Sequence, residues 1–308
     1  MIGGFFVNIQ WYPGHMTKAK RAMKEDMKLI DLVIELVDAR VPLASRNPDL
    51  DELGKGKARV VLLNKADLAD QRMNEAWTRY FQEQGFLVLK VNARSGSGLK
   101  QLNGVVQEAC REKIERDRKR GILNRPVRAM VVGIPNVGKS TFINSFAGKA
   151  CTKTGNKPGV TKGNQWIRLN RTLELLDTPG ILWPKFEDQQ AGLLLALIGS
   201  INDEILNREE LAMELVRLLA EHYPQELKNR YPVEALEGED RANGISMAQA
   251  AGILEQIARL RGCLQKGGDT DTAKAASMVL DDFRSGKLGR ITLERRECHG
   301  AENDRREA

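Results

Sequence analysis

A phosphate-binding pattern occupies residues 133–140, which read Gly133-Ile134-Pro135-Asn136-Val137-Gly138-Lys139-Ser140 and fit G-x-x-x-x-G-K-[ST]. The segment follows a strand-like run, Ala129–Val132, and opens a helix-like one, Lys139–Ala147. At such a turn, backbone N–H groups converge on phosphate oxygens, and the helix dipole favours the anion. We expect Lys139 to reach the β- and γ-phosphates and the Ser140 hydroxyl to bind Mg²⁺. The pattern predicts a nucleotide site that also includes Asn136, Val137, Gly138 and Thr141.

A second phosphate-sensing element is Asp177-Thr178-Pro179-Gly180, which ends the strand-like run Leu173–Leu176 about forty residues later. We expect Asp177 to hold Mg²⁺ through water and the Gly180 N–H to contact the γ-phosphate. Between the two elements, Thr161 is expected to supply a second hydroxyl to the metal. A D-x-x-G motif alone is weak, but its position at a strand end after the first pattern makes it informative.

We expect the base of the nucleotide to be recognised by Asn64-Lys65-Ala66-Asp67, which follows the buried run Arg59–Leu63. The Asp67 carboxylate can accept from both N1–H and the 2-amino group of guanine, donors that adenine lacks. The Lys65 stem can pack along the base, and Asn64 can brace neighbouring loops. Further on, Asn92-Ala93-Arg94 ends another strand, where the Ala93 N–H is expected to bind guanine O6. Together these residues favour GTP over ATP.

The elements that position these loops alternate between short apolar strands and helices, which indicates a doubly wound, mostly parallel α/β sheet. The strand-like runs are Leu32–Val37, Arg59–Leu63, Phe86–Val91, Ala129–Val132, Leu173–Leu176 and the half-exposed Gln165–Leu169; the helix-like ones are Met16–Ile30, Gln71–Gln84, Leu99–Arg120 and Lys139–Ala147. The base-reading motifs precede the phosphate-binding ones, the reverse of the usual GTPase order. Ligands in such folds contact loops at the carboxyl ends of strands whatever their order, so a circular permutation is physically acceptable.

After about Trp183 the strand patterns stop, and four helix-like stretches follow: Ala191–Ile201, Arg208–His222, Ser246–Arg261 and Thr270–Ser285. We therefore expect three parts. Residues 1–184 form the nucleotide-binding domain, 185–290 a small all-helical domain, and 291–308 a disordered tail, because 294–308 is charged and nearly free of large apolar residues.

In this motif set and its order, the sequence resembles the YlqF-type circularly permuted GTPases. Further segments typical of that family are Trp11-Tyr12-Pro13-Gly14-His15-Met16, Asp38-Ala39-Arg40-Val41-Pro42 and Ser45-Arg46-Asn47-Pro48. The resemblance covers residues 8–285. It implies a GTPase domain followed by a helical RNA-binding domain, acting as a switch in late assembly of the large (50S) ribosomal subunit. The implied partners are the 50S precursor and its rRNA.

Hydrolysis needs a group that orients water, and the position after D-x-x-G, where many GTPases have Gln, is Ile181. The resemblance points instead to His15, whose neutral imidazole could orient the water; alternatively, His15 caps the helix that begins near Thr17. Asn136 matches a feature of potassium-stimulated GTPases, and a bound K⁺ would supply positive charge at the phosphates.

The net charge of +7 divides unevenly. Residues 1–189 hold 32 Lys/Arg and 20 Asp/Glu, whereas residues 190–290 hold 12 and 16. We therefore expect the nucleotide-binding domain to make many rRNA phosphate contacts, through the acid-free stretch Lys149–Arg171 and the basic face of Met16–Ile30. In the helical domain, a local basic patch that binds RNA and merely solvated helix faces remain equal alternatives.

Composition narrows the other possibilities. No apolar run reaches the roughly 18 residues of a membrane span, and the N-terminus lacks the pattern of a secretory signal. The four cysteines lie far apart, so we expect a reduced, cytoplasmic protein that is a monomer off the ribosome. Two alternatives stay open: a GTPase that acts on another RNA such as tRNA, and a nucleotide-gated RNA-binding module with negligible catalysis.

Overall fold

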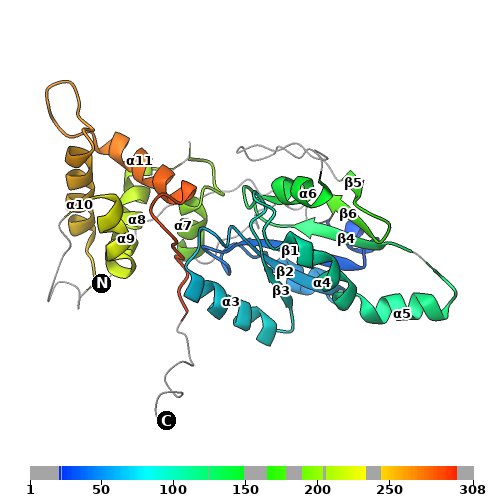
Figure 1. Ribbon diagram of the computed structural model, residues 1–308. Helices are drawn as coiled ribbons and strands as arrows, with labels where there is room; N and C mark the ends of the chain where they lie inside the picture. The colour runs from blue at the N-terminus through cyan, green and yellow to red at the C-terminus, as the bar shows by residue number, and fades with distance from the viewer. Residues whose placement is uncertain are drawn as a thin grey trace, which may run out of the picture.

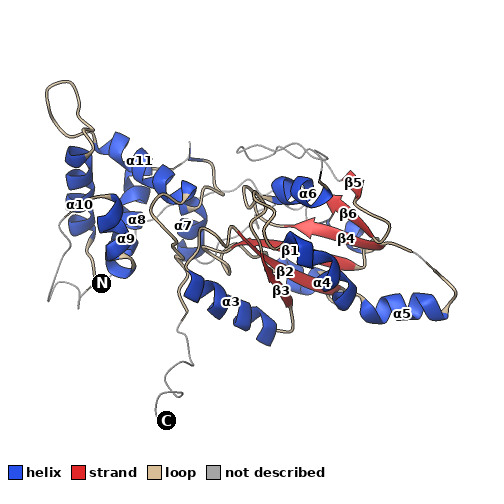
Figure 2. Ribbon diagram, in the orientation of Figure 1, coloured by secondary structure: helices blue, strands red, loops and turns tan. Residues whose placement is uncertain are grey.

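The computed structural model describes residues 21, 23–123, 125–148, 165–177, 189–203, 206–233 and 244–296. Its centre is a six-stranded sheet of order β3-β2-β1-β4-β6-β5 (Figures 1 and 2). The strands are β1 (Leu32–Asp38), β2 (Ala58–Asn64), β3 (Leu87–Lys90), β4 (Val127–Val132), β5 (Gln165–Arg168) and β6 (Leu173–Asp177). All neighbouring pairs are parallel except β5 with β6. The predicted mostly parallel α/β sheet is confirmed.

Helices cover both faces of the sheet, and the alternation of side chains along β1 explains why. Leu32, Ile34 and Leu36 point into a core built with α4 (Leu102–Ala109) and α6 (Lys139–Ala147). The residues between them point to the opposite face, where Val37 packs against α3 (Gln71–Glu83). On that face Val33 packs with Met23 and Met27, part of the apolar stripe expected of the first helix. Because both faces are buried, the central strands are mostly apolar, and β1 also carries two buried acids, Glu35 and Asp38.

The predicted helix over 99–120 is divided into three pieces. A 3₁₀ turn, Leu99–Gln101, leads into α4, and α5 (Arg111–Lys119) begins after Cys110, which is buried. None of the α5 residues is buried, and the helix projects away from the sheet before the chain returns as β4 (Figure 1). Its sequence is rich in charged residues that favour a helix, but it has no apolar stripe that could pack on the domain. A short helix that the sequence analysis did not predict, α2 (Asp49–Leu53), lies between β1 and β2.

The remaining helices gather beside the sheet as an all-helical part (Figure 2). They are α7 (Gln189–Leu197), α8 (Arg208–His222), α9 (Pro224–Arg230), α10 (Met247–Leu260) and α11 (Thr272–Ser285). Four correspond to the predicted helices, and the short α9 was not predicted. α8 packs against α10 and α11 through Leu215, Ile257 and Val279, all fully buried. Within the described residues, no helix has both the length and the apolar character to cross a membrane.

The chain does not leave the fold at residue 290, where the sequence analysis placed the start of a disordered tail. Residues 291–296 run from the end of α11 back toward α3 (Figure 1). Thr292 is fully buried, and the Ile291 N–H donates to the Leu68 carbonyl at 2.9 Å. The Glu294 carboxylate accepts the backbone N–H groups of Leu43 and Ala44 at 2.6 and 2.7 Å. We call residues 291–296 the C-terminal strap; its two apolar residues, Ile291 and Leu293, are buried in the main core, but two apolar residues are too few to form a pattern that composition could reveal.

Candidate nucleotide site

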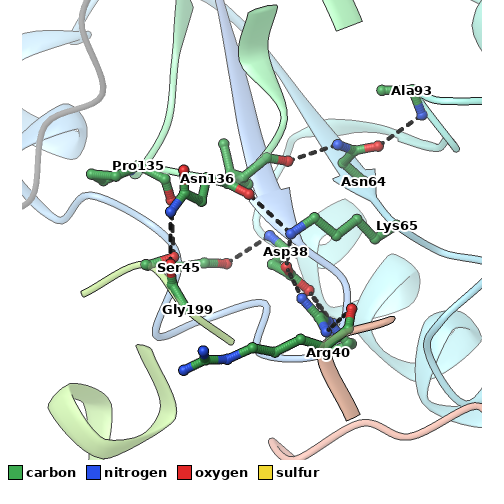
Figure 3. A network of polar contacts seen from close by, with 12 residues as sticks. Asp38, Arg40, Ser45, Asn64, Lys65, Ala93, Pro135, Asn136 and Gly199 are labelled. Carbon is green, nitrogen blue, oxygen red and sulfur yellow. Dashed lines mark hydrogen bonds and ion pairs between the residues drawn. The ribbon is translucent and has the colours of Figure 1, made fainter. Parts of the chain in front are cut away.

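The predicted nucleotide-binding loops gather at one edge of the sheet. Because β1, β2, β3, β4 and β6 are parallel, their carboxyl ends lie along the same edge. β1 lies between β2 and β4, so the loop after Asn64 faces the phosphate-binding loop after Val132 across a single strand. Segments seventy residues apart in the chain thus form one site (Figure 3).

The phosphate-binding loop has the geometry of a strand-to-helix turn. Gly138 takes φ of 101° and lies at the N-cap of α6, so Ser140 and Thr141 belong to the first turn of that helix. The Lys139 ammonium donates to the carbonyls of Gly133 and Ile134 at 2.9 and 3.1 Å, which holds it over the loop. An N-terminal helix turn with a lysine above it is suited to bind phosphate oxygens.

Asn64 joins the two sides of the site. Its Nδ2 donates to the Val137 carbonyl at 2.7 Å, and its Oδ1 accepts the Ala93 N–H at 3.0 Å (Figure 3). The approach is close: a Cβ on Gly138 would lie 2.6 Å from Asn64 Nδ2. Asn64 is buried, so it braces three loops rather than facing solvent.

The loop after β3 differs from the prediction in one respect. The Ala93 N–H, expected to bind guanine O6, is donated to Asn64 instead, and Ala93 is buried. Asn92 Oδ1 accepts the next two N–H groups, those of Arg94 and Ser95, at 2.9 and 3.0 Å. The sequence could not show this because the donated hydrogen bond depends on a side chain that is 29 residues away in the chain.

Lys65 and Asp67 differ in exposure. Lys65 has φ of 58°, and its Nζ lies 2.9 Å from the Asn136 carbonyl oxygen and 2.9 Å from Asp38 Oδ2. Burial lowers the pKa of Lys65, an effect that the neighbouring Asp38 charge opposes. Asp67 is exposed two residues later, at the same edge of the sheet. A carboxylate there is open to a ligand, while the lysine head is held within the protein.

The helical part touches the phosphate-binding loop directly. Asn136 Nδ2 donates to the Gly199 carbonyl at 2.8 Å, and the Ser200 hydroxyl donates to the Pro135 carbonyl at 2.9 Å (Figure 3). Asn136, like Lys65, has φ of 58°. Gly199 and Ser200 were not predicted as site residues, and no sequence motif marks them.

The other predicted site residues are placed less fully. Asp177 ends β6 opposite Val131 of β4, so its backbone lies beside the start of the phosphate-binding loop. His15, Thr161 and Gly180 lie outside the described residues, and so does Ile181. Hydroxyl and carboxylate oxygens are suitable ligands for Mg²⁺, so Ser140 and Asp177 stay the predicted ligands within the part of the chain that the structure describes.

Two buried charged residues at the end of β1, Asp38 and Arg40, join the site without having been predicted as site residues. Both are at most 1% exposed, and the Arg40 guanidinium donates to the Asp38 carboxylate through Nε and Nη2 at 2.9 and 2.8 Å. An available signal was the position of Asp38 at the end of an apolar strand, the same position that Asn64 has on β2.

A doubly wound sheet, a phosphate-binding strand–loop–helix and an N-K-x-D loop braced against it define a P-loop GTPase with motifs in a permuted chain order. Residues 128–232 match the protein family described as 50S ribosome-binding GTPase. The chain belongs to the ribosome biogenesis GTPase A family, also called YlqF.

Two relatives and two solved structures support that assignment. The chain is 48% identical to ribosome biogenesis GTPase A of Bacillus cereus over 292 residues, 95% of each chain. It is 32% identical to that of Thermotoga maritima, over 94% of this chain and 95% of the relative. GDP-bound YlqF superposes with a TM-score of 0.61 at 28% identity, covering 90% of this chain and 100% of the other. GNP-bound YlqF from T. maritima gives a TM-score of 0.59, with 90% and 98% covered.

Proposed function

We propose that this GTPase is a molecular switch that binds the precursor of the large ribosomal subunit in the cytoplasm, contacts its rRNA and acts late in its assembly. The reaction is GTP plus water to GDP plus phosphate, in which the water oxygen bonds to the γ-phosphorus and the bond to the β–γ bridging oxygen breaks. The single observation that carries the switch is the pair of contacts from Gly199 and Ser200 to the phosphate-binding loop. A conformational change in that loop would therefore move Gly199 and Ser200 and, with them, the helical part.

The nucleotide is held from both ends in this proposal. Asp67 reads the guanine edge and Lys65 packs its stem along the base, while Lys139 and the first turn of α6 bind phosphates. Ser140, Thr161 and Asp177 are the proposed Mg²⁺ ligands, and the ion neutralises phosphate charge. For K⁺, the ligand atom is Asn136 Oδ1, since Nδ2 is the donor to Gly199. His15 is the proposed water-orienting residue.

The test is GTP turnover by the full chain with and without 50S particles, in K⁺ and in Na⁺. We expect slow turnover alone, stimulation by the particles, and a large loss of stimulated turnover in His15→Ala with GDP affinity unchanged. Turnover that stays negligible with particles while GTP-dependent binding persists would favour the alternative of a nucleotide-gated RNA-binding module. Equal affinity of the GTP-analogue and GDP forms for the particle would argue against a switch.

For the rRNA contact, the described residues offer α5. Seven Lys/Arg and three acids lie between Arg111 and Arg125, and Arg116, Lys119 and Arg120 are exposed. The helix buries none of its residues against the protein, so its basic side chains can reach an RNA backbone. Their charge supports the expectation that the GTPase domain itself contacts phosphates.

A matched pair of triple variants locates the RNA face. Neutralising Arg116, Lys119 and Arg120 to Ala should weaken 50S binding and reduce the slope of log affinity against log salt by about 2 to 3. The helical-part control neutralises Arg259, Lys266 and Lys274. If only the control variant reduced the slope, the RNA contact would belong to the helical part.

A further inference from the structure

A buried group of charges stands at the end of β1, beneath the guanine-reading loop. The Asp38 carboxylate, fully buried, accepts from Arg40 Nε, Arg40 Nη2 and the Arg40 backbone N–H, and its Oδ2 lies 2.9 Å from Lys65 Nζ. The flanking Val37 and Ala39 are fully buried apolar residues. Taking charges out of water is costly, and an apolar pair of similar volume often serves the core as well. The buried charges are therefore better explained by a group that they position than by a contribution to stability.

What they hold is the head of Lys65. Its Nζ is fixed at two points, Asp38 Oδ2 and the Asn136 carbonyl, while its backbone has a left-handed φ of 58° that few non-glycine residues adopt (Figure 3). With both ends fixed, the four-carbon stem between them has little freedom to move. Such a stem forms a preformed apolar surface for a purine ring.

Arg40 is held in turn by the helical part. Its Nη1 lies 3.4 Å from the Arg284 carbonyl, its guanidinium stands 5.2 Å from the centre of the Phe283 ring, and its carbonyl accepts the Leu293 N–H at 2.8 Å. Arg284 itself donates to the carbonyls of Ala196 and Leu197 at the end of α7. The position of Arg40, and hence of the carboxylate it pairs with, thus depends on α7, α11 and the C-terminal strap.

We propose that Asp38 and Arg40 are positioning residues for guanine binding: Asp38 fixes the head of Lys65, and Arg40 ties Asp38 to the helical part. The inference rests on the proposed role of Lys65 at the base. Burial by itself would raise the pKa of Asp38, but the Arg40 and Lys65 charges and hydrogen bonds lower it overall, so the carboxylate stays ionised at neutral pH. A neutral Asn at 38 would hold Lys65 through one weak contact at most.

The test is a double-mutant cycle on nucleotide affinity, with Asp38→Asn, Lys65→Met and the combination in the full chain. GDP affinity is measured by calorimetry, and KM and kcat for GTP by phosphate release. We expect each single variant to raise the Kd for GDP by about ten- to a hundredfold, the loss of one charge-assisted hydrogen bond. The double variant should be no weaker than Lys65→Met alone. Because Lys65 is proposed to pack along the base, the KM for GTP should rise in parallel with the Kd for GDP in all three variants.

A control on the same strand separates positioning from folding. Glu35 is also a buried acid of β1, paired with Arg59 and Arg46 at 3.0 and 3.3 Å, and neither arginine contacts Lys65. Glu35→Gln should lower the thermal midpoint as Asp38→Asn does, yet leave the Kd for GDP unchanged. Arg40→Lys keeps a cation beside Asp38, so it retains the fold, and it should raise the Kd less than Asp38→Asn does.

Three results would overturn the proposal: additive effects in the cycle, a normal Kd for Asp38→Asn, or an equal rise in Kd for Glu35→Gln. These leave the proposed function intact, because the wild type would still bind GDP and hydrolyse GTP. A wild type that binds no GDP would overturn the proposed function along with this inference.

Discussion

Lys65 Nζ donates to the Asn136 carbonyl at 2.9 Å, and these two are the non-glycine residues with positive φ in the described part of the chain, each at 58°. One belongs to the base-reading loop and the other to the phosphate-binding loop. Left-handed backbone at such residues costs of order 1–3 kcal/mol and persists only where surrounding contacts determine it. The two strained loops therefore stabilise each other at the nucleotide site.

The strain at Asn136 predicts an unusual order of stabilities. Asn136→Ala and Asn136→Gly both lose the bond to Gly199, but only glycine adopts this φ without a steric penalty. We expect Asn136→Gly to be more stable than Asn136→Ala by about 1 kcal/mol, measured by urea unfolding. An alanine variant as stable as the glycine variant would show that the backbone relaxes.

Gly138→Ala should impair nucleotide binding severely. The new Cβ would lie 2.6 Å from Asn64 Nδ2 at a φ of 101°, so the Asn64 brace must break or the loop must move. We expect GDP affinity to fall by at least about a hundredfold, the effect of losing a buried hydrogen bond and the loop geometry together.

Gly85→Ala is the matched control for backbone strain. Its φ is 83° and its Cβ would meet nothing within 4 Å. It should lower stability by about 1 kcal/mol while leaving GDP affinity unchanged. Equal losses of affinity in the two variants would mean that the Gly138 effect is global.

The C-terminal strap should contribute measurably to stability. Glu294→Ala removes two charge-assisted hydrogen bonds to the Leu43 and Ala44 N–H groups, so we expect a loss of about 1.5–3 kcal/mol in denaturant unfolding. Glu255→Ala, which breaks an exposed pair with Arg259, should cost no more than about 0.5 kcal/mol. Comparable costs would show that the strap is weakly attached.

A single substitution, Asp67→Asn, should shift the base preference of the site from guanine toward xanthine. Xanthine carries a carbonyl where guanine carries its 2-amino group, and Asp67→Asn replaces one acceptor at that point with a donor. We expect the variant to lose affinity for GDP and gain it for XDP, in competition measurements with the wild type in parallel. Unchanged preference for GDP would remove Asp67 from the base site.

Acidification should weaken the helical part through Asp282. Burial would raise the pKa of Asp282, but hydrogen bonds from Tyr231 and Arg230, at 2.8 and 2.7 Å, lower it overall. Because the folded pKa lies below the unfolded one, this stabilisation is present above about pH 4 and is lost as the pH falls further. Asp282→Asn should be less stable at pH 7, and its free energy of unfolding should fall less steeply below pH 4. Both are measured by unfolding monitored with circular dichroism.

Much of the site was predictable because its motifs are local. The strand–loop–helix at 133–147 and the N-K-x-D loop after β2 are short segments whose chemistry follows from residue type and spacing. The C-terminal strap, and the break that separates α4 from α5, were missed for the opposite reason. Glu294 looks like a tail residue until its carboxylate meets two N–H groups 250 residues away, and α5 continues a helical pattern whose break at Cys110 is set by burial.

The sequence by itself determined the class of fold, the order of the motifs and the side chains able to bind GTP, because apolar periodicity and short motifs act over a few residues. Only the tertiary structure decided which of those groups meet. In the folded chain the Ala93 N–H donates to Asn64, the Lys65 ammonium pairs with Asp38, and Asn136 of the phosphate-binding loop donates to Gly199. Parallel strands bring their carboxyl ends together from distant parts of the chain, so hydrogen-bond partners there depend on sheet order, which no local pattern encodes.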